Sequence, residues 1–208
     1  MTDACFPRPE TLRTQGLQIS RGNLDLVCGL NLQLGPGEVL GVSGPSGSGK
    51  TTLLRTLAGL DHRYSGTITR PAGRLAMVFQ EPRLLPWATA LQNVTITGCT
   101  DAQAQHWLTR TGLGAAADLY PAAMSGGMRQ RASIARALSA DPKILLVDEP
   151  FSALDVRLAQ DLRSLLLSII RASHLICIWV SHNPDEIAQV STSRLHLTGS
   201  AGAVSHST

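Results

Sequence analysis

The run Gly44-Pro45-Ser46-Gly47-Ser48-Gly49-Lys50-Thr51 constrains what this chain can fold into more than any other feature. It matches the pattern G-x-x-x-x-G-K-[ST], in which glycines let backbone amides surround phosphate groups at the start of a helix. Residues 38–43 before it form an apolar run typical of a strand, and residues 51–60 after it carry leucines at helical spacing. The sequence therefore predicts a strand, a phosphate-binding loop (P-loop) and a helix. A flexible Gly/Ser-rich loop is the alternative, and it does not explain the flanking elements.

Two further motifs bear on the same chemistry. Ser125-Gly126-Gly127 opens a predicted helix, and an apolar strand over residues 144–147 runs into Asp148-Glu149. A serine hydroxyl, two unhindered amides and a helix dipole suit contact with a phosphate, although Ser125 could instead be a simple N-cap. In phosphoryl transfer, an aspartate in this place holds Mg²⁺, and Glu149 is placed to orient or deprotonate the attacking water.

Strands alternate with helices along most of the chain, which predicts an α/β fold with a parallel, doubly wound sheet. Residues 17–42 instead read as short strands joined by tight turns. In a doubly wound sheet, ligands bind beyond the carboxyl ends of the strands. The P-loop, Asp148-Glu149 and Ser181-His182 all fall at such ends. We expect one domain over residues 1–208, made of a core (about 15–82 and 140–198), a helical sub-region (about 83–139) and a small, polar, frayed tail (199–208).

The composition excludes some classes of protein. A net charge of +3 among 208 residues is too small to predict nucleic-acid binding, and we expect no nucleic-acid partner. Four cysteines without a C-x-x-C pair are typical of free thiols in a reducing compartment. Residues 1–10 lack the apolar stretch of a signal peptide, and no run is long enough for a membrane span. We therefore expect any membrane role to come through a partner.

Together, the P-loop, the Ser-Gly-Gly helix and the strand ending in Asp-Glu resemble the ATP-binding cassette (ABC) ATPases. The resemblance spans roughly residues 15–198. It implies a P-loop cassette with a parallel sheet core, an N-terminal antiparallel β region and a small helical sub-region, using ATP and Mg²⁺. The chain already uses its P-loop for its own ATP, so Ser125-Gly126-Gly127 would act on ATP held by another subunit. This arrangement implies a dimer with two shared sites.

The resemblance also implies a role for individual residues. Glu149, His182, Gln80 and Lys50 would be catalytic, and Thr51, Gln80 and Asp148 would hold the metal. The residues expected to bind ATP are Gly44, Pro45, Ser46, Gly47, Ser48, Gly49, Lys50, Thr51, Thr52, Arg21, Ser125, Gly126, Gly127 and Asp155. Asp155 matches the family's D-loop, which lies across the dimer interface, although it could equally be a helix N-cap.

The sequence departs from the family pattern at two places. Met128 stands where the signature motif usually has Gln, a variation familiar among importers. The family also stacks an aromatic residue on adenine, and none occurs in the corresponding run, Ile19-Ser20-Arg21-Gly22-Asn23. We expect the guanidinium of Arg21 to contact the base by a cation–π interaction instead.

The run Val78-Phe79-Gln80-Glu81-Pro82-Arg83-Leu84-Leu85-Pro86-Trp87 is similar to the importer branch that handles nitrate, alkylsulfonates and taurine. Leu84, Leu85 and Trp87 would suit a groove for a short helix of a membrane subunit, or would simply pack within the helical sub-region. The resemblance implies an ATPase subunit that energises import of a small solute through a separate permease. It would work on the cytoplasmic face of the inner membrane, with a second copy or homologous ATPase and a secreted solute-binding protein. A stand-alone soluble ATPase is the alternative.

Overall fold

The structure is a computed structural model that describes residues 10–22, 24–151, 154, 156–198 and 204–207. Its strands are β1 (Leu12–Arg21), β2 (Leu24–Leu34), β3 (Val39–Ser43), β4 (Tyr64–Thr69), β5 (Arg74–Val78), β6 (Pro142–Asp148), β7 (Ile176–Val180), β8 (Ser193–Leu197) and β9 (Val204–Ser207). Its α-helices are α1 (Lys50–Leu57), α2 (Ala90–Thr95), α3 (Asp101–Arg110), α4 (Gly126–Ser139), α5 (Val156–Ala172) and α6 (Pro184–Val190).

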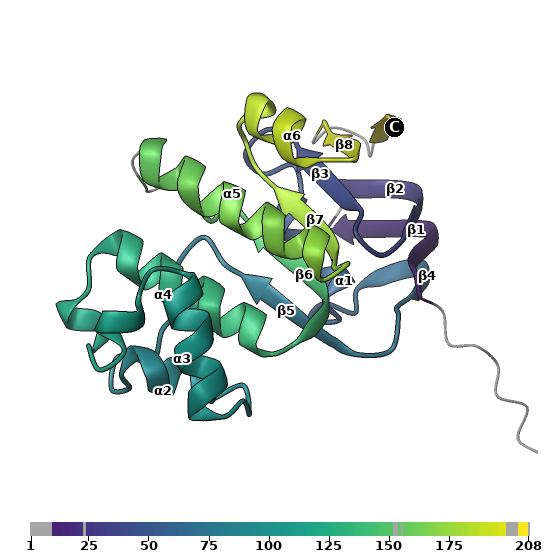
Figure 1. The fold of residues 1–208 in the computed structure, drawn as a ribbon. Helices are drawn as coiled ribbons and strands as arrows, with labels where there is room; N and C mark the ends of the chain where they lie inside the picture. Colours follow the sequence, from purple (N-terminus) through teal and green to yellow (C-terminus); the bar gives the residue numbers. More distant parts are fainter. Residues whose placement is uncertain (1–9, 23, 152–153, 155, 199–203, 208) are drawn as a thin grey trace, which may run out of the picture.

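The described strands form two sheets (Figure 1). In the three-stranded sheet, β1 pairs antiparallel with both β2 and β4. The six-stranded sheet has the order β5-β6-β7-β3-β8-β9, and its first five strands run parallel. This arrangement confirms the predicted α/β fold with a parallel core and an N-terminal antiparallel region.

Helices cover both faces of the parallel sheet, which explains why its central strands read as continuous apolar runs. Helix α1 packs its leucines between the two sheets, against β1, β2, β6 and β7. On the opposite face, α5, α6 and the C-terminal part of α4 pack against Val147, Trp179 and their neighbours. Both layers leave the carboxyl ends of β3, β6 and β7 together at one edge.

The helical sub-region has an apolar cluster of its own, formed by α2, α3 and one face of α4. Figure 1 shows these three helices gathered at the β5 side of the molecule, away from the three-stranded sheet. Helices α2 and α3 each begin with a capping box, at Thr89 and Thr100. Thr89 therefore fixes the start of α2 at Ala90, and Thr100 fixes the start of α3 at Asp101.

The end of the chain differs from the expected frayed tail. Residues 204–207 form β9, which pairs antiparallel with β8. Strand pairing at a sheet edge uses backbone groups and needs no apolar side chains, so a polar segment could not reveal it. No helix in the described part of the chain is long and apolar enough to cross a membrane.

Candidate nucleotide-binding site

The P-loop connects β3 to α1, so its backbone amides lie at the N-terminus of a helix. Gly49 is the N-cap of α1, with φ 98°, and a Cβ there would lie 2.9 Å from the Cβ of Leu26. Gly44 has φ 148°, and a Cβ there would overlap the carbonyl group of Leu197. Side chains at these two positions would distort the loop, which explains why both are glycine.

Lys50 begins α1 and folds back over the loop, leaving its side chain only 8% exposed. Its Nζ donates hydrogen bonds to the carbonyl oxygens of Gly44, at 2.8 Å, and Pro45, at 2.9 Å. The same Nζ lies 4.0 Å from Oε1 of Glu149. The ammonium group therefore sits at the mouth of the loop, where phosphate oxygens could replace the two carbonyls.

A cleft of about 500 Å³ extends from the P-loop to the β1–β2 hairpin. It is lined by Arg21, Leu24, Leu26, Ser46, Gly47, Gly49, Lys50, Thr51, Thr52, Gln80, Asp148 and Glu149. Gly44 and Pro45 line a neighbouring hollow that shares Ser46, Lys50 and Glu149 with the cleft and adds His182. Ser48 is buried beneath the loop. The structure thus brings most of the predicted site residues together, while Leu24 and Leu26 were not among them.

Thr51 and Asp148 lie side by side in the cleft. The Thr51 hydroxyl donates to Oδ2 of Asp148 at 3.2 Å. Burial raises the pKa of the Asp148 carboxyl above its ordinary value, the hydrogen bond from Thr51 opposes this shift, and the Glu149 carboxylate adds to it. A buried carboxylate of this kind gains from a nearby cation. Hydroxyl and carboxylate oxygens are also ligands that Mg²⁺ accepts.

Glu149 directly follows β6 and His182 follows the neighbouring parallel strand β7, so their side chains reach the same edge. Nδ1 of His182 lies 3.0 Å from Oε2 of Glu149. Glu149 has a left-handed φ of 45°, and its N–H donates to the carbonyl of Val180 at 3.1 Å. Its carboxylate therefore lies between the ammonium of Lys50 and the imidazole of His182, in a position to take a proton from water.

Gln80 follows β5 and lines the cleft, and helix α4 holds its loop from outside. Gln130 donates from Nε2 to the carbonyl of Phe79 at 3.2 Å. The guanidinium of Arg136 donates to the carbonyls of residues 82 and 83, both at 2.8 Å. Sequence reasoning missed these two α4 side chains, because nothing local marks a side chain that bonds a distant backbone. The loop of Gln80 is thus tied to the helix that begins beside Ser125.

Arg21 lines the cleft at the β1–β2 hairpin, but its guanidinium already has a partner. It forms an ion pair with Asp61, a residue 9% exposed that Arg63 also approaches. The carboxylate of Asp61 therefore fixes the orientation of the Arg21 side chain near Leu24. Contact between Arg21 and adenine stays a prediction.

Ser125 caps α4: its Oγ accepts a hydrogen bond from the N–H of Met128 at 3.2 Å, which confirms the predicted N-cap. Ser125, Gly126 and Gly127 do not line the P-loop cleft of their own chain. Gly126 is exposed, and a Cβ there would meet no atom within 4 Å, so the start of α4 is open to an outside group. Contact with the ATP of a second chain stays a prediction. Asp155 lies outside the described residues.

The apolar residues after Gln80 differ in how far their side chains are buried. Leu84 packs against the helical sub-region, Leu85 is half-buried, and Trp87 is 73% exposed. Leu119 and Tyr120 are also exposed, on a segment joined to the start of α2 by the hydrogen bond from the N–H of Ala90 to the carbonyl of Leu119. Packing within the sub-region therefore accounts for Leu84 but leaves Trp87 without such a role.

Comparisons with known proteins agree with this geometry. The ABC transporter family matches residues 27–152. The aliphatic sulfonates import ATP-binding protein SsuB 1 of Pseudomonas syringae pv. syringae is 41% identical over 182 residues, covering 86% of this chain and 76% of that protein. SsuB 2 of Burkholderia cenocepacia is 40% identical over 202 residues, covering 90% and 75%.

A solved structure is similar over nearly its whole length. The ATP-binding cassette MJ0796, in a dimeric post-hydrolysis state bound to ADP and Pi, superposes with a TM-score of 0.81 and 26% identity, covering 93% of this chain and 97% of that one. The P-loop cleft, the two-sheet fold and these relatives agree with one another, and the chain belongs to the ATP-binding ATPases of the ABC transporter family.

Proposed function

We propose that this chain hydrolyses Mg²⁺-ATP in the P-loop cleft to drive import of an aliphatic sulfonate, or a similar small solute, through a separate permease. The observation that carries the proposal is the Glu149 carboxylate held between Lys50 and His182 at the end of the cleft. The names of the relatives, which are sulfonate import proteins, support the class of solute.

In the proposed reaction, the ATP phosphates lie against the P-loop amides and Lys50 exchanges its two carbonyl partners for phosphate oxygens. Glu149 accepts a proton as water attacks the γ-phosphorus, the bond to the β–γ bridging oxygen breaks, and ADP and phosphate leave. His182 contacts the γ-phosphate. Thr51, Asp148 and Gln80 are the residues that would hold Mg²⁺, which supplies positive charge to the phosphate oxygens.

The proposed assembly is a dimer in which each ATP lies between the P-loop of one chain and Ser125-Gly126-Gly127 of the other. Ser125 caps α4 and Gly126 beside it is exposed, which supports this arrangement. Asp155 would lie at the same interface. The dimer would sit on the cytoplasmic face of the inner membrane, beneath the permease, and would serve a secreted solute-binding protein.

We propose that the permease contacts the exposed apolar residues Trp87, Leu119 and Tyr120, which the hydrogen bond from the N–H of Ala90 to the carbonyl of Leu119 brings to the same part of the sub-region. Exposed aromatic residues of this kind are typical anchors of protein interfaces. Trp87 lies only seven residues after Gln80, so a partner bound there could respond to the state of the cleft.

The test compares wild-type protein with two variants that the geometry separates. Glu149→Gln should bind ATP normally and lose nearly all hydrolysis, because it removes the proton acceptor and leaves the P-loop intact. Lys50→Ala should weaken ATP binding itself. Substantial turnover by Glu149→Gln would remove Glu149 from its central role.

The solute and assembly need separate measurements. Uptake of a labelled alkylsulfonate should fail in cells that lack this chain, return with the wild-type gene, and not return with Glu149→Gln. Uptake that persists without the chain would favour the stand-alone ATPase. The Glu149→Gln protein should also dimerise in ATP and not without it, and a strictly monomeric protein would contradict the shared site.

A further inference from the structure

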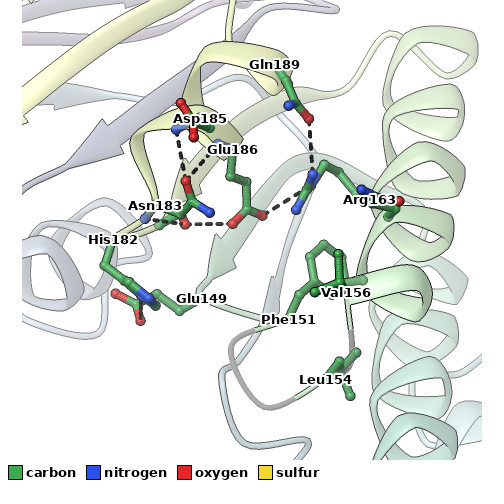
Figure 2. Close-up of a pocket in the computed structure, with 13 residues that line it drawn as sticks. Glu149, Phe151, Leu154, Val156, Arg163, His182, Asn183, Asp185, Glu186 and Gln189 are labelled. Carbon is green, nitrogen blue, oxygen red and sulfur yellow. Dashed lines mark hydrogen bonds and ion pairs between the residues drawn. The ribbon is translucent and has the colours of Figure 1, made fainter.

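A buried polar cluster lies behind the turn that carries His182. Its centre is Glu186 of α6, which is 9% exposed. Oε2 of Glu186 accepts a hydrogen bond from the hydroxyl of Ser181 at 2.7 Å, and Oε1 accepts one from the indole Nε1 of Trp179 at 3.2 Å. Arg163 of α5 brings its Nε within 3.5 Å of Oε1. Figure 2 shows the Glu186 carboxylate between the His182–Asn183 turn and Arg163.

The contacts of this carboxylate differ in kind. The Arg163 Nε–H does not point well enough at Glu186 to form a hydrogen bond, so that contact is an attraction between charges. Arg163 also donates from Nη1 to Oε1 of Gln189 at 3.1 Å. The directed hydrogen bonds of Glu186 thus go to Trp179, which is fully buried in β7, and to Ser181. A buried carboxylate is stable only with such partners, so its position is well fixed.

The turn itself is held on both sides of His182. The Ser181 hydroxyl, while it donates to Glu186, accepts a hydrogen bond from the N–H of Asn183 at 3.1 Å. Asn183 caps α6, with its Oδ1 accepting from the N–H of Asp185 at 2.9 Å. His182 by contrast is 64% exposed and meets Glu149. Apart from this contact with Glu149, the place of its imidazole is set by the backbone of this turn.

We propose that Glu186, acting through Ser181, is a positioning residue that aims His182 at the γ-phosphate. The proposal rests on the ATPase function proposed above. Glu186 does not line the P-loop cleft; it lines a neighbouring hollow with Glu149 and His182, and its short hydrogen bond to Ser181 links it to the turn. Loss of the Ser181–Glu186 bond should let the turn shift without changing the P-loop. Since a misplacement of about 1 Å can cost about a hundredfold in rate, we expect kcat to fall about ten- to a hundredfold.

The experiment compares Ser181→Ala with three reference proteins in steady-state hydrolysis and in binding of a non-hydrolysable ATP analogue. His182→Ala shows the effect of losing the imidazole, and Gln189→Ala removes a contact of Arg163 that does not touch the turn. Glu186→Gln is the conservative variant, because its amide can still accept from Trp179 and donate to Ser181. Ser181→Ala should lose kcat and keep analogue affinity within about twofold. Gln189→Ala should match wild type, and Glu186→Gln should retain more activity than Ser181→Ala.

A double variant separates positioning from general weakening of the fold. If Ser181 acts only through His182, adding Ser181→Ala to His182→Ala should cause no further loss of kcat. Additive losses, or a Ser181→Ala protein at the wild-type rate, would overturn the proposal.

A second readout does not depend on activity. The ring signals of His182 in NMR spectra of nucleotide-free protein should change in Ser181→Ala and stay unchanged in Gln189→Ala. Unaltered signals in Ser181→Ala would also overturn the proposal. A wild-type protein without ATPase activity would instead refute the proposed function, and the NMR comparison would still decide whether Glu186 holds His182.

Discussion

Arg136 offers the sharpest test of how the Gln80 loop is held. Its guanidinium spans the carbonyls of Pro82 and Arg83, at 2.8 Å each. Burial lowers the pKa of Arg136, but an arginine still carries its charge at neutral pH. Replacing it by alanine removes both hydrogen bonds and leaves the two carbonyls to water. The loop that carries Gln80 then loses its contact with α4 at this point.

The size of the effect follows from the two bonds. A hydrogen bond to a charged group contributes about 1.5–3 kcal/mol. The bond to Arg83 is exposed and the bond to Pro82 is partly buried, so the bond to Arg83 contributes less to the free energy of unfolding. We expect Arg136→Ala to lower the free energy of unfolding by about 2–3 kcal/mol. For a chain of this size, each kcal/mol lowers the Tm by about 2–4 °C.

The assay pairs denaturant unfolding with steady-state hydrolysis. Arg70→Ala is the matched control, because the Arg70 guanidinium also spans two carbonyls, those of Leu57 and Thr56, at 2.8 and 3.0 Å. Both variants should lose comparable stability, and Arg136→Ala alone should also lose kcat. Equal activity in the two variants would refute the link between α4 and Gln80, and an unchanged unfolding free energy would refute the bonds themselves.

Three further predictions follow from charge and exposure. The pKa of Asp148 is higher in the folded than in the unfolded protein. The nucleotide-free protein therefore loses stability as the pH rises from the unfolded pKa to the folded pKa of this carboxyl. Asp148→Asn should therefore have a higher Tm than wild type at pH 7, with the difference vanishing near pH 4 and below; a constant difference would contradict this. Arg21→Ala should cost about 1 kcal/mol of stability, because Asp61 loses one of its two cationic partners, and should raise the ATP dissociation constant a few-fold; unchanged ATP affinity would make Arg21 purely structural. Trp87→Ala should keep its Tm and ATP affinity, because the side chain is 73% exposed, and should lose co-purification with the permease; a large drop in Tm would show a packing role.

The sequence predicted those parts of the fold that depend on local pattern. Apolar runs identified the strands, and the serine before two glycines identified the start of α4 at Ser125. Helix α6 escaped notice, although Asn183 followed by Pro184 and two acids is a helix start that could have been recognised.

The rest depended on contacts between distant segments. Asp61 pairs with Arg21, 40 residues before it, and Gln130 reaches Phe79 across 51 residues. The buried carboxylate of Glu186 is likewise explained only by the side chains that surround it. Motif spacing predicted the residues expected to meet the nucleotide, whereas the residues that hold them in place follow from tertiary packing.

Glu149 has a left-handed backbone conformation, which lowers the stability of the fold at the position that carries the proposed catalytic carboxylate. A residue with a Cβ lowers the free energy of unfolding by about 1–2 kcal/mol in this conformation, and glycine avoids that cost. A laboratory selection for survival at high temperature alone would therefore favour glycine at this position and discard the carboxylate. Asp141 and His174 have similar φ angles, of 49° and 51°, at the opposite edge of the sheet, before β6 and β7. Glycine at Asp141 or His174 would remove the same backbone strain without changing the P-loop cleft, so these two positions are the better starting points for raising the Tm.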